Sequence, residues 1–271
     1  MKKIRACFFD LDGTLIRTDH TVSPAVIRLI RRLETEGIET IISTGRSYEA
    51  LLPIKEELGI HSPVISYNGA MISNGKDGSI MASHAVPDEE ARKVIDIARK
   101  GDFHILAYRD GNLIYEKERA EAREYAVHIL LKGKVINYDD FDSLNLMKCL
   151  IIGDHEDLIP VQEEIRSVCG DRINVFFSNP RYLEIVNKNV DKGRAVAEVM
   201  SLLGSSTDEA LALGDGFNDL PMLQAAGHGV VMGNALPALK ELFPPERTAG
   251  HVDEDGAVNY LKEFFQWTDF S

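Results

Sequence analysis

The sequence is poor in cysteine and in basic charge, and it contains no long hydrophobic run. Its three cysteines, Cys7, Cys149 and Cys169, are far apart and form no CxxC pair. This pattern indicates reduced thiols rather than a disulfide framework. No apolar stretch approaches the length of a membrane span, and the N-terminus lacks the apolar core of a signal peptide. We therefore expect a cytoplasmic protein with no membrane partner.

Basic residues are outnumbered, with 30 lysines and arginines against 43 acidic residues and a formal net charge of −13. Such a surface repels nucleic acid, and no stretch rich in lysine and arginine reverses the balance. We expect no nucleic-acid partner. An anionic substrate would need a local reversal of charge, which a metal ion supplies most simply.

The first and last parts of the chain carry the pattern of a doubly wound, mainly parallel α/β sheet, in which short buried strands alternate with amphipathic helices. A helix is expected from Ser23 to Gly37, with Ser23 as the N-cap and Pro24 at the first helical position. A second helix is expected from about Ser47 to Leu58. Strands are expected over residues 3–10, 38–44, 63–69, 209–215 and 228–233.

The middle of the chain differs, because hairpins are mixed with helices there. Helices are expected over residues 87–101, 119–133 and 155–170, and strands over 103–108, 112–116, 147–153, 173–178 and 181–187. The Asp110-Gly111 step between two of these strands is a hairpin signal. We predict an α+β domain with an antiparallel sheet over residues 83–187, inserted into a core formed by residues 1–82 and 188–271.

Polar residues follow several of the predicted core strands or open a late helix. In an open α/β sheet the carboxyl ends of the strands converge on one crevice, so these residues are expected to meet there. They are Asp10, Asp12, Thr44, Gly45, Lys192, Asp215, Asn218 and Asp219.

Each of these signals has an ordinary structural explanation when it is taken alone. Asp10 and Asp12 could lie in a surface turn, Thr44 could be a helix N-cap, and Lys192 could be solvated. The joint placement of all of them after hydrophobic runs favours a functional site instead.

Phosphoryl transfer is the chemistry that fits this set. Carboxylate oxygens suit Mg²⁺, which would offset both their charge and that of a phosphate. One carboxylate can attack phosphorus to give an acyl phosphate, and a second one, two residues along, can protonate the leaving oxygen and then activate water. Lysine, hydroxyl and backbone donors would hold the phosphoryl oxygens.

Seven short segments are spread along nearly the whole chain, in the order FFDLDGTL, STGR, YNGA, VDKGRAV, LGDGFNDLPML, GVVMGNA and DEDGAV. In this set the chain resembles the haloacid dehalogenase-like (HAD) superfamily, and within it the Cof-type sugar-phosphate phosphatases. The resemblance implies a Rossmann-like HAD core and an inserted α/β cap that selects the substrate.

The resemblance also implies a role for each matching residue. Asp10 would be the nucleophile and Asp12 the general acid/base. The phosphoryl group would be bound by Thr44 and Lys192, together with Leu11 (through its backbone), Gly45 and Asn218. Mg²⁺ would be held by the Asp10 carboxylate, the main-chain carbonyl of Asp12 and the Asp215 side chain. Asp219 would support these ligands without being one of them.

The expected function is therefore Mg²⁺-dependent hydrolysis of a small phosphomonoester by a monomeric enzyme. A phosphomutase of the same superfamily is the nearest alternative, because it shares the first motif. A protein that binds phosphoesters without catalysis is a further alternative, but it would be expected to have lost a catalytic group, and none is missing. The substrate itself stays open.

Overall fold

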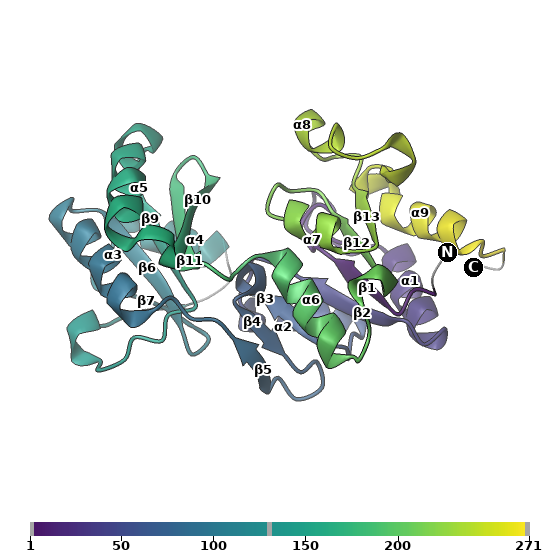
Figure 1. Cartoon of the computed structure of the whole chain (residues 1–271), viewed down its shortest axis with the longest axis horizontal. Helices are drawn as coiled ribbons and strands as arrows, with labels where there is room; N and C mark the ends of the chain where they lie inside the picture. Colours follow the sequence, from purple (N-terminus) through teal and green to yellow (C-terminus); the bar gives the residue numbers. More distant parts are fainter. Residues whose placement is uncertain (1–2, 129–131, 269–271) are drawn as a thin grey trace. The chain divides into compact units, whose positions relative to one another are not determined.

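The chain divides into two compact units in the computed structural model, which describes residues 3–128 and 132–268 (Figure 1). The first unit is made of Met1–Gly45, Leu51–Met81 and Asp191–Ser271. The second unit is made of Arg46–Ala50 and Ala82–Val190. Each unit has its own sheet.

The sheet of the first unit has the strand order β13-β12-β1-β2-β3-β4-β5. The strands from β13 to β3 are parallel to their neighbours, whereas β4 is antiparallel to β3. This order confirms the predicted doubly wound fold, because the chain moves outward from β1 in one direction through β2 and β3 and in the other through β12 and β13. The strands are β1 (Ala6–Phe9), β2 (Glu39–Ser43), β3 (Val64–Ser66), β4 (Met71–Ser73), β5 (Ile80–Ser83), β12 (Ala210–Gly214) and β13 (His228–Val231).

Helices pack in pairs against this sheet, α1 with α9 and α6 with α7 (Figure 1). Helix α1 forms as its sequence predicts: the Ser23 side chain accepts a hydrogen bond from the Val26 N–H, Pro24 opens the helix, and Gly37 follows it with a φ of +72°. The helices of this unit are α1 (Pro24–Thr35), α6 (Lys192–Leu202), α7 (Leu220–Ala225), α8 (Pro237–Lys240), α9 (Gly256–Phe265) and most of α2 (Tyr48–Leu58), whose first three residues belong to the second unit.

The second unit has a sheet of order β10-β11-β9-β6-β7-β8, which is antiparallel except that β8 runs parallel to β7. The predicted hairpin between β6 and β7 is confirmed, with Asp110 and Gly111 both at positive φ in its turn. The strands are β6 (His104–Arg109), β7 (Asn112–Tyr115), β8 (Gly133–Val135), β9 (Lys148–Ile152), β10 (Ile173–Asn179) and β11 (Tyr182–Asn187).

Helices α3 (Asp88–Lys100) and α5 (His155–Cys169) pack on each other and enclose the apolar core of the second unit. That core includes Val94 and Ile95 of α3, Ile165 of α5, and Cys149 and Ile151 of β9. Helix α4 (Ala120–His128) contacts β6 and β8. The unit is thus the mixed α+β arrangement that its sequence pattern indicates.

Some local expectations were wrong. The helix expected over residues 119–133 ends at His128 in the described part of the chain; residues 129–131 lie outside it, and Gly133 begins β8. Strands β4, β5 and β8 were not anticipated. They are only three or four residues long, and pairing with a neighbouring strand rather than local pattern defines them.

The three cysteines are free and buried. Among the described residues, no helix is both long enough and apolar enough to span a membrane.

Candidate active site

All the residues singled out from the sequence belong to the first unit. Strands β1 and β12 lie side by side and parallel, with Phe9 opposite Leu213, and the chain leaves this pair in opposite directions. Asp10 directly follows β1, and its N–H donates to the Leu213 carbonyl at 3.0 Å. Asp215 directly follows β12. The two carboxylates therefore emerge at the point where strand order reverses, which is where open α/β sheets bind ligands.

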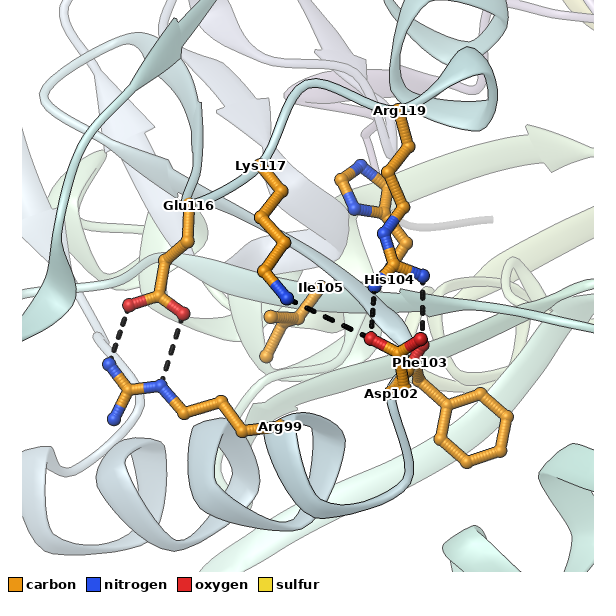
Figure 2. A pocket seen from close by; sticks show the side chains of 8 residues that line it. All are labelled: Arg99, Asp102, Phe103, His104, Ile105, Glu116, Lys117 and Arg119. Atoms are coloured by element: carbon orange, nitrogen blue, oxygen red, sulfur yellow. Dashed lines mark hydrogen bonds and ion pairs between the residues drawn. The ribbon is translucent and has the colours of Figure 1, made fainter.

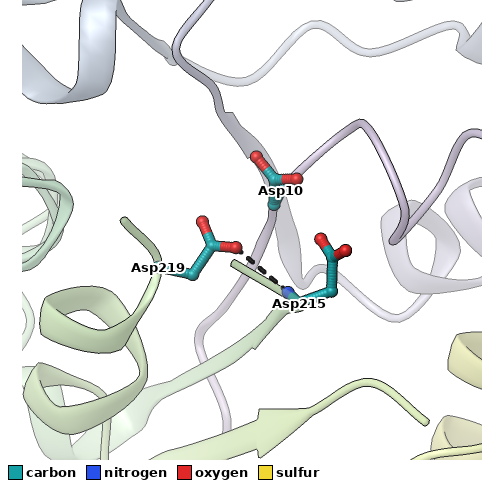
Figure 3. A group of neighbouring side chains, drawn as sticks. All are labelled: Asp10, Asp215 and Asp219. Atoms are coloured by element: carbon teal, nitrogen blue, oxygen red, sulfur yellow. Dashed lines mark hydrogen bonds between the residues drawn. The ribbon is translucent and has the colours of Figure 1, made fainter. Parts of the chain in front are cut away.

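Three carboxylates gather at this point (Figure 3). One oxygen each of Asp10, Asp215 and Asp219 lies within 4.8 Å of the others. Asp10 is 7% exposed and Asp219 is 1% exposed, so two of these groups are almost removed from water. The side chain of Asp12 is exposed and is not part of this cluster.

Lys192 supplies the positive charge within the cluster. Its side chain has no exposed surface, and its Nζ donates to Asp10 Oδ1 at 2.6 Å and to Asp219 Oδ1. Asp219 Oδ2 accepts from the backbone N–H of Asp215 at 3.0 Å and of Gly216 at 2.8 Å. The first of these bonds is the dashed line in Figure 3. Both oxygens of Asp219 are therefore occupied, whereas Asp10 Oδ2 makes none of the hydrogen bonds described for the cluster.

Burial and mutual repulsion dominate the electrostatics. Burial raises the pKa of Asp10 well above its usual range, and the charge of Asp219 raises it further, while Lys192 acts in the opposite direction. Burial and the charge of Asp219 also raise the pKa of Asp215, to about 6. Burial lowers the pKa of Lys192, but the charges of Asp10 and Asp219 outweigh that effect and raise it. One ammonium does not offset three carboxylates, so the site favours a further cation.

Asn234, for which the sequence motifs predict no role, also holds Asp215 in place. Asn234 Nδ2 donates to Asp215 Oδ2 at 3.2 Å and to the Gly13 carbonyl at 2.8 Å. Gly13 has a φ of +84°, and a Cβ there would lie 2.3 Å from Asp215 Oδ2. Any residue larger than glycine would displace the carboxylate. The available signal for Asn234 was its place in GVVMGNA, directly after a predicted core strand.

The predicted phosphate-binding residues follow neighbouring elements. Thr44 is buried after β2, and its N–H donates to the Ile65 carbonyl at 3.0 Å. Gly45 follows it, and Asn218 is exposed between Asp215 and Asp219. The side chain of Leu11 is buried, so only its backbone is suited to the predicted role.

A small cavity of about 70 Å³ in the second unit is lined by three basic side chains and is therefore an alternative location for an anion (Figure 2). Its cations are already paired with carboxylates: Arg99 Nε donates to Glu116 at 3.0 Å, and Arg119 and Lys117 both form ion pairs with Asp102. It contains none of the residues predicted from the sequence. The carboxylate–lysine cluster of the first unit is the better candidate.

The sequence pattern of one known family matches residues 7–261, and that family is the haloacid dehalogenase-like hydrolases. The chain belongs to this family. The Cof-type HAD assignment predicted from the motifs is thereby confirmed. An HMP-PP phosphatase of Serratia proteamaculans is 30% identical over 263 residues, which are 97% of this chain and 96% of that protein. A putative phosphatase of Haemophilus influenzae is 29% identical over 267 residues, 96% of this chain and 97% of that protein.

Solved structures agree with the family assignment. A haloacid dehalogenase-like hydrolase from Bacteroides thetaiotaomicron matches with a TM-score of 0.88 and 29% identity over 97% of this chain and 100% of its own. A crystal structure from Thermotoga maritima matches with a TM-score of 0.84 and 30% identity, covering 96% of this chain and 97% of its own. The predicted fold class is confirmed, and so is the enzyme class: the chain is a HAD-type phosphatase that acts on phosphomonoesters.

Proposed function

We propose that this HAD phosphatase is Mg²⁺-dependent and hydrolyses small phosphorylated metabolites, such as sugar phosphates, through an aspartyl-phosphate on Asp10. The observation that carries the proposal is the placement of Lys192. It is fully buried and bonded to both Asp10 and Asp219, next to Asp215, where the strand order reverses. Bringing a lysine and three carboxylates together in a largely buried site costs folding free energy. Phosphoryl transfer makes use of both the positive and the negative groups.

The donor set fits Mg²⁺. Asp10 and Asp215 each offer a hard carboxylate oxygen, and these two oxygens lie within 4.8 Å of each other, so one ion could contact both. The main-chain carbonyl of Asp12 follows Asp10 by two residues. Asp219 would support the site without contacting the ion, since its oxygens are bonded to Lys192 and to backbone N–H groups. When bound, the ion supplies positive charge against the carboxylates and the phosphoryl oxygens.

In the first step an oxygen of Asp10 attacks phosphorus and the bond from phosphorus to the ester oxygen breaks. Asp12 donates its proton to the leaving oxygen, so the alcohol departs neutral. In the second step a water attacks the phosphorus of the aspartyl-phosphate and gives its proton to Asp12. The bond between Asp10 and phosphorus then breaks to release inorganic phosphate. The exposure of Asp12 suits a group that must reach both the leaving alcohol and water.

Lys192, Thr44, Gly45, Asn218 and the backbone of Leu11 would hold the phosphoryl oxygens. Donors fixed before the reaction need no reorganisation as charge develops in the transition state. Lys192 is the most firmly fixed of these, because both of its carboxylate partners are themselves buried.

The second unit would then be the substrate-selecting cap. Its removal is expected to change the ranking of substrates more than it reduces phosphate release from a generic aryl phosphate, since all the proposed catalytic residues lie in the first unit. The measurement compares kcat/KM over several phosphate esters for the full chain and for a variant with residues 83–187 replaced by a short flexible linker. Circular dichroism would verify that the variant is folded. An unchanged ranking would show that the second unit does not select.

A phosphate-release screen tests the proposed function directly. The panel contains an aryl phosphate, hexose phosphates and HMP-PP, the compound after which several relatives are named, each with Mg²⁺ and with excess chelator. We expect release with Mg²⁺ and loss of activity on chelation. Activity that persists in excess chelator would defeat the metal assignment, and an isomerised ester in place of free phosphate would identify a mutase.

A further inference from the structure

The turn that follows β3, residues Tyr67–Gly69, has an unusual backbone. Its three residues have φ angles of +52°, +57° and +106°, and the first two are not glycine. Positive φ is uncommon for residues with a side chain, and asparagine tolerates it better than tyrosine does. Two such residues in succession indicate that the surroundings hold the turn in place, which is typical of functional sites.

Asn68 connects this turn to two segments of the candidate active site. Its N–H donates to the Thr44 carbonyl at 2.9 Å, and its Oδ1 accepts from Asn218 Nδ2 at 3.2 Å. Gly45 also lies against Asn68, since a Cβ built on Gly45 would lie 3.1 Å from Asn68 Oδ1. The Asn68 side chain is 8% exposed, so it lies between these segments rather than in solvent.

Gly69 connects the same turn to a third segment. A Cβ on Gly69 would lie 2.5 Å from the main-chain oxygen of Asp191, so only glycine allows this approach. Asp191 is the N-cap of α6, and Lys192 is the first residue of that helix. The turn therefore contacts the segments that carry Thr44, Asn218 and Lys192, which are far apart in the sequence.

We propose that Asn68 is a positioning residue for phosphoryl transfer, acting through Asn218 and the Thr44–Gly45 segment to hold the phosphate-binding groups in one arrangement. This proposal rests on the phosphatase function proposed above. Asn68 suits the role for two reasons. Its side-chain oxygen accepts the hydrogen bond from Asn218, and asparagine tolerates the positive φ that the turn requires.

The test replaces Asn68 with glycine, which tolerates the positive φ and keeps the backbone N–H, but removes the side chain with its amide. We expect kcat to fall by about 10- to 100-fold, because small misplacements of binding groups are that costly. The factor should be the same for an aryl phosphate and a hexose phosphate, since the phosphoryl group is common to both. The inhibition constant of inorganic phosphate should rise about tenfold.

Asn145→Gly is the matched control. Asn145 also has a positive φ (+45°), is exposed, and lies in the second unit. The same chemical change there should leave kcat and phosphate inhibition unaltered.

A double-mutant cycle separates positioning from mere structural support. Because Asn68 is bonded to Asn218, the effects of Asn68→Gly and Asn218→Ala on kcat should be far from additive, with the double variant close to the worse single one. Additive effects would overturn the proposal. So would an Asn68→Gly protein that melts earlier yet keeps the wild-type kcat per folded molecule and the wild-type phosphate inhibition.

The outcomes distinguish this proposal from the one on which it rests. Absence of phosphate release by the wild-type enzyme would contradict the proposed function. A fully active wild type with an equally active Asn68→Gly variant would contradict only the role of Asn68. A loss that differs strongly between leaving groups would also contradict it, because it would place Asn68 in recognition of the leaving group.

Discussion

Replacing Asp10 with asparagine is expected to abolish turnover while the fold stays intact. The amide has nearly the shape of the carboxylate and can still accept a bond from Lys192, but it is a far weaker nucleophile. Loss of the group that forms the covalent intermediate should lower kcat by about 10⁴-fold or more. The measurement is phosphate release from an aryl phosphate with Mg²⁺, with acid-quenched phosphoenzyme as a second readout.

The thermal midpoint of Asp10→Asn should stay at or above that of the wild type, because burial and the charge of Asp219 disfavour an ionised Asp10. Asp171→Asn is the matched control, since the Asp171 side chain is 96% exposed and lies in the second unit. It should leave both readouts unchanged. A near-normal kcat in Asp10→Asn would remove Asp10 from the nucleophile role.

Replacing Lys192 with methionine is expected to damage both stability and catalysis. The change keeps most of the side-chain volume but leaves Asp10 and Asp219 buried without their ammonium partner. Removing one partner of a buried pair typically costs about 3–5 kcal/mol of stability. Turnover should fall by about 10³-fold, as for other losses of a fixed donor to the transition state. Urea denaturation in chelator and phosphate release provide the two measurements.

The pH dependence tests whether charge causes this loss of stability. The pKa values of Asp10 and Asp215 are raised in the folded protein, so the folded state binds more protons than the unfolded state as the pH falls below about 6. In the metal-free protein, stability should therefore rise as the pH falls from about 6 toward the ordinary carboxyl range of about 4. The deficit of Lys192→Met should shrink over the same interval, because protonation removes the repulsion that the lysine offset.

Lys148→Met is the control, because it removes a buried lysine that lies outside the candidate active site. Lys148 is 3% exposed and bonded to Glu184 at 3.2 Å, but it lies in the second unit. It should reduce stability and leave the turnover of an aryl phosphate within about threefold. A deficit of Lys192→Met that is independent of pH would assign the loss to packing instead of charge.

Local sequence signals were sufficient to predict most helices and strands of the fold. Ser23, Pro24 and Gly37 define α1 through capping and backbone preferences that act within a few residues. The Asp110-Gly111 turn likewise defines a hairpin on its own. The prediction is wrong at β8, because the sequence pattern predicts a helix through Gly133 and the structure has a strand there. Strand pairing with β7 decides that segment, and such pairing leaves no local pattern in three residues.

For the active site, too, the local sequence and the tertiary structure determined different features. By itself the sequence determined which groups are present and that Asp10, Thr44 and Asp215 each follow a strand, because hydrophobic runs and motifs are local. Only the tertiary structure decided how these groups meet. It put β1 beside β12, brought Lys192 to both Asp10 and Asp219, and set Asn234 and Asn68 against the catalytic segments. These contacts join residues up to about two hundred positions apart, and their free energy comes from burial and packing of the whole first unit, which no short stretch of sequence encodes.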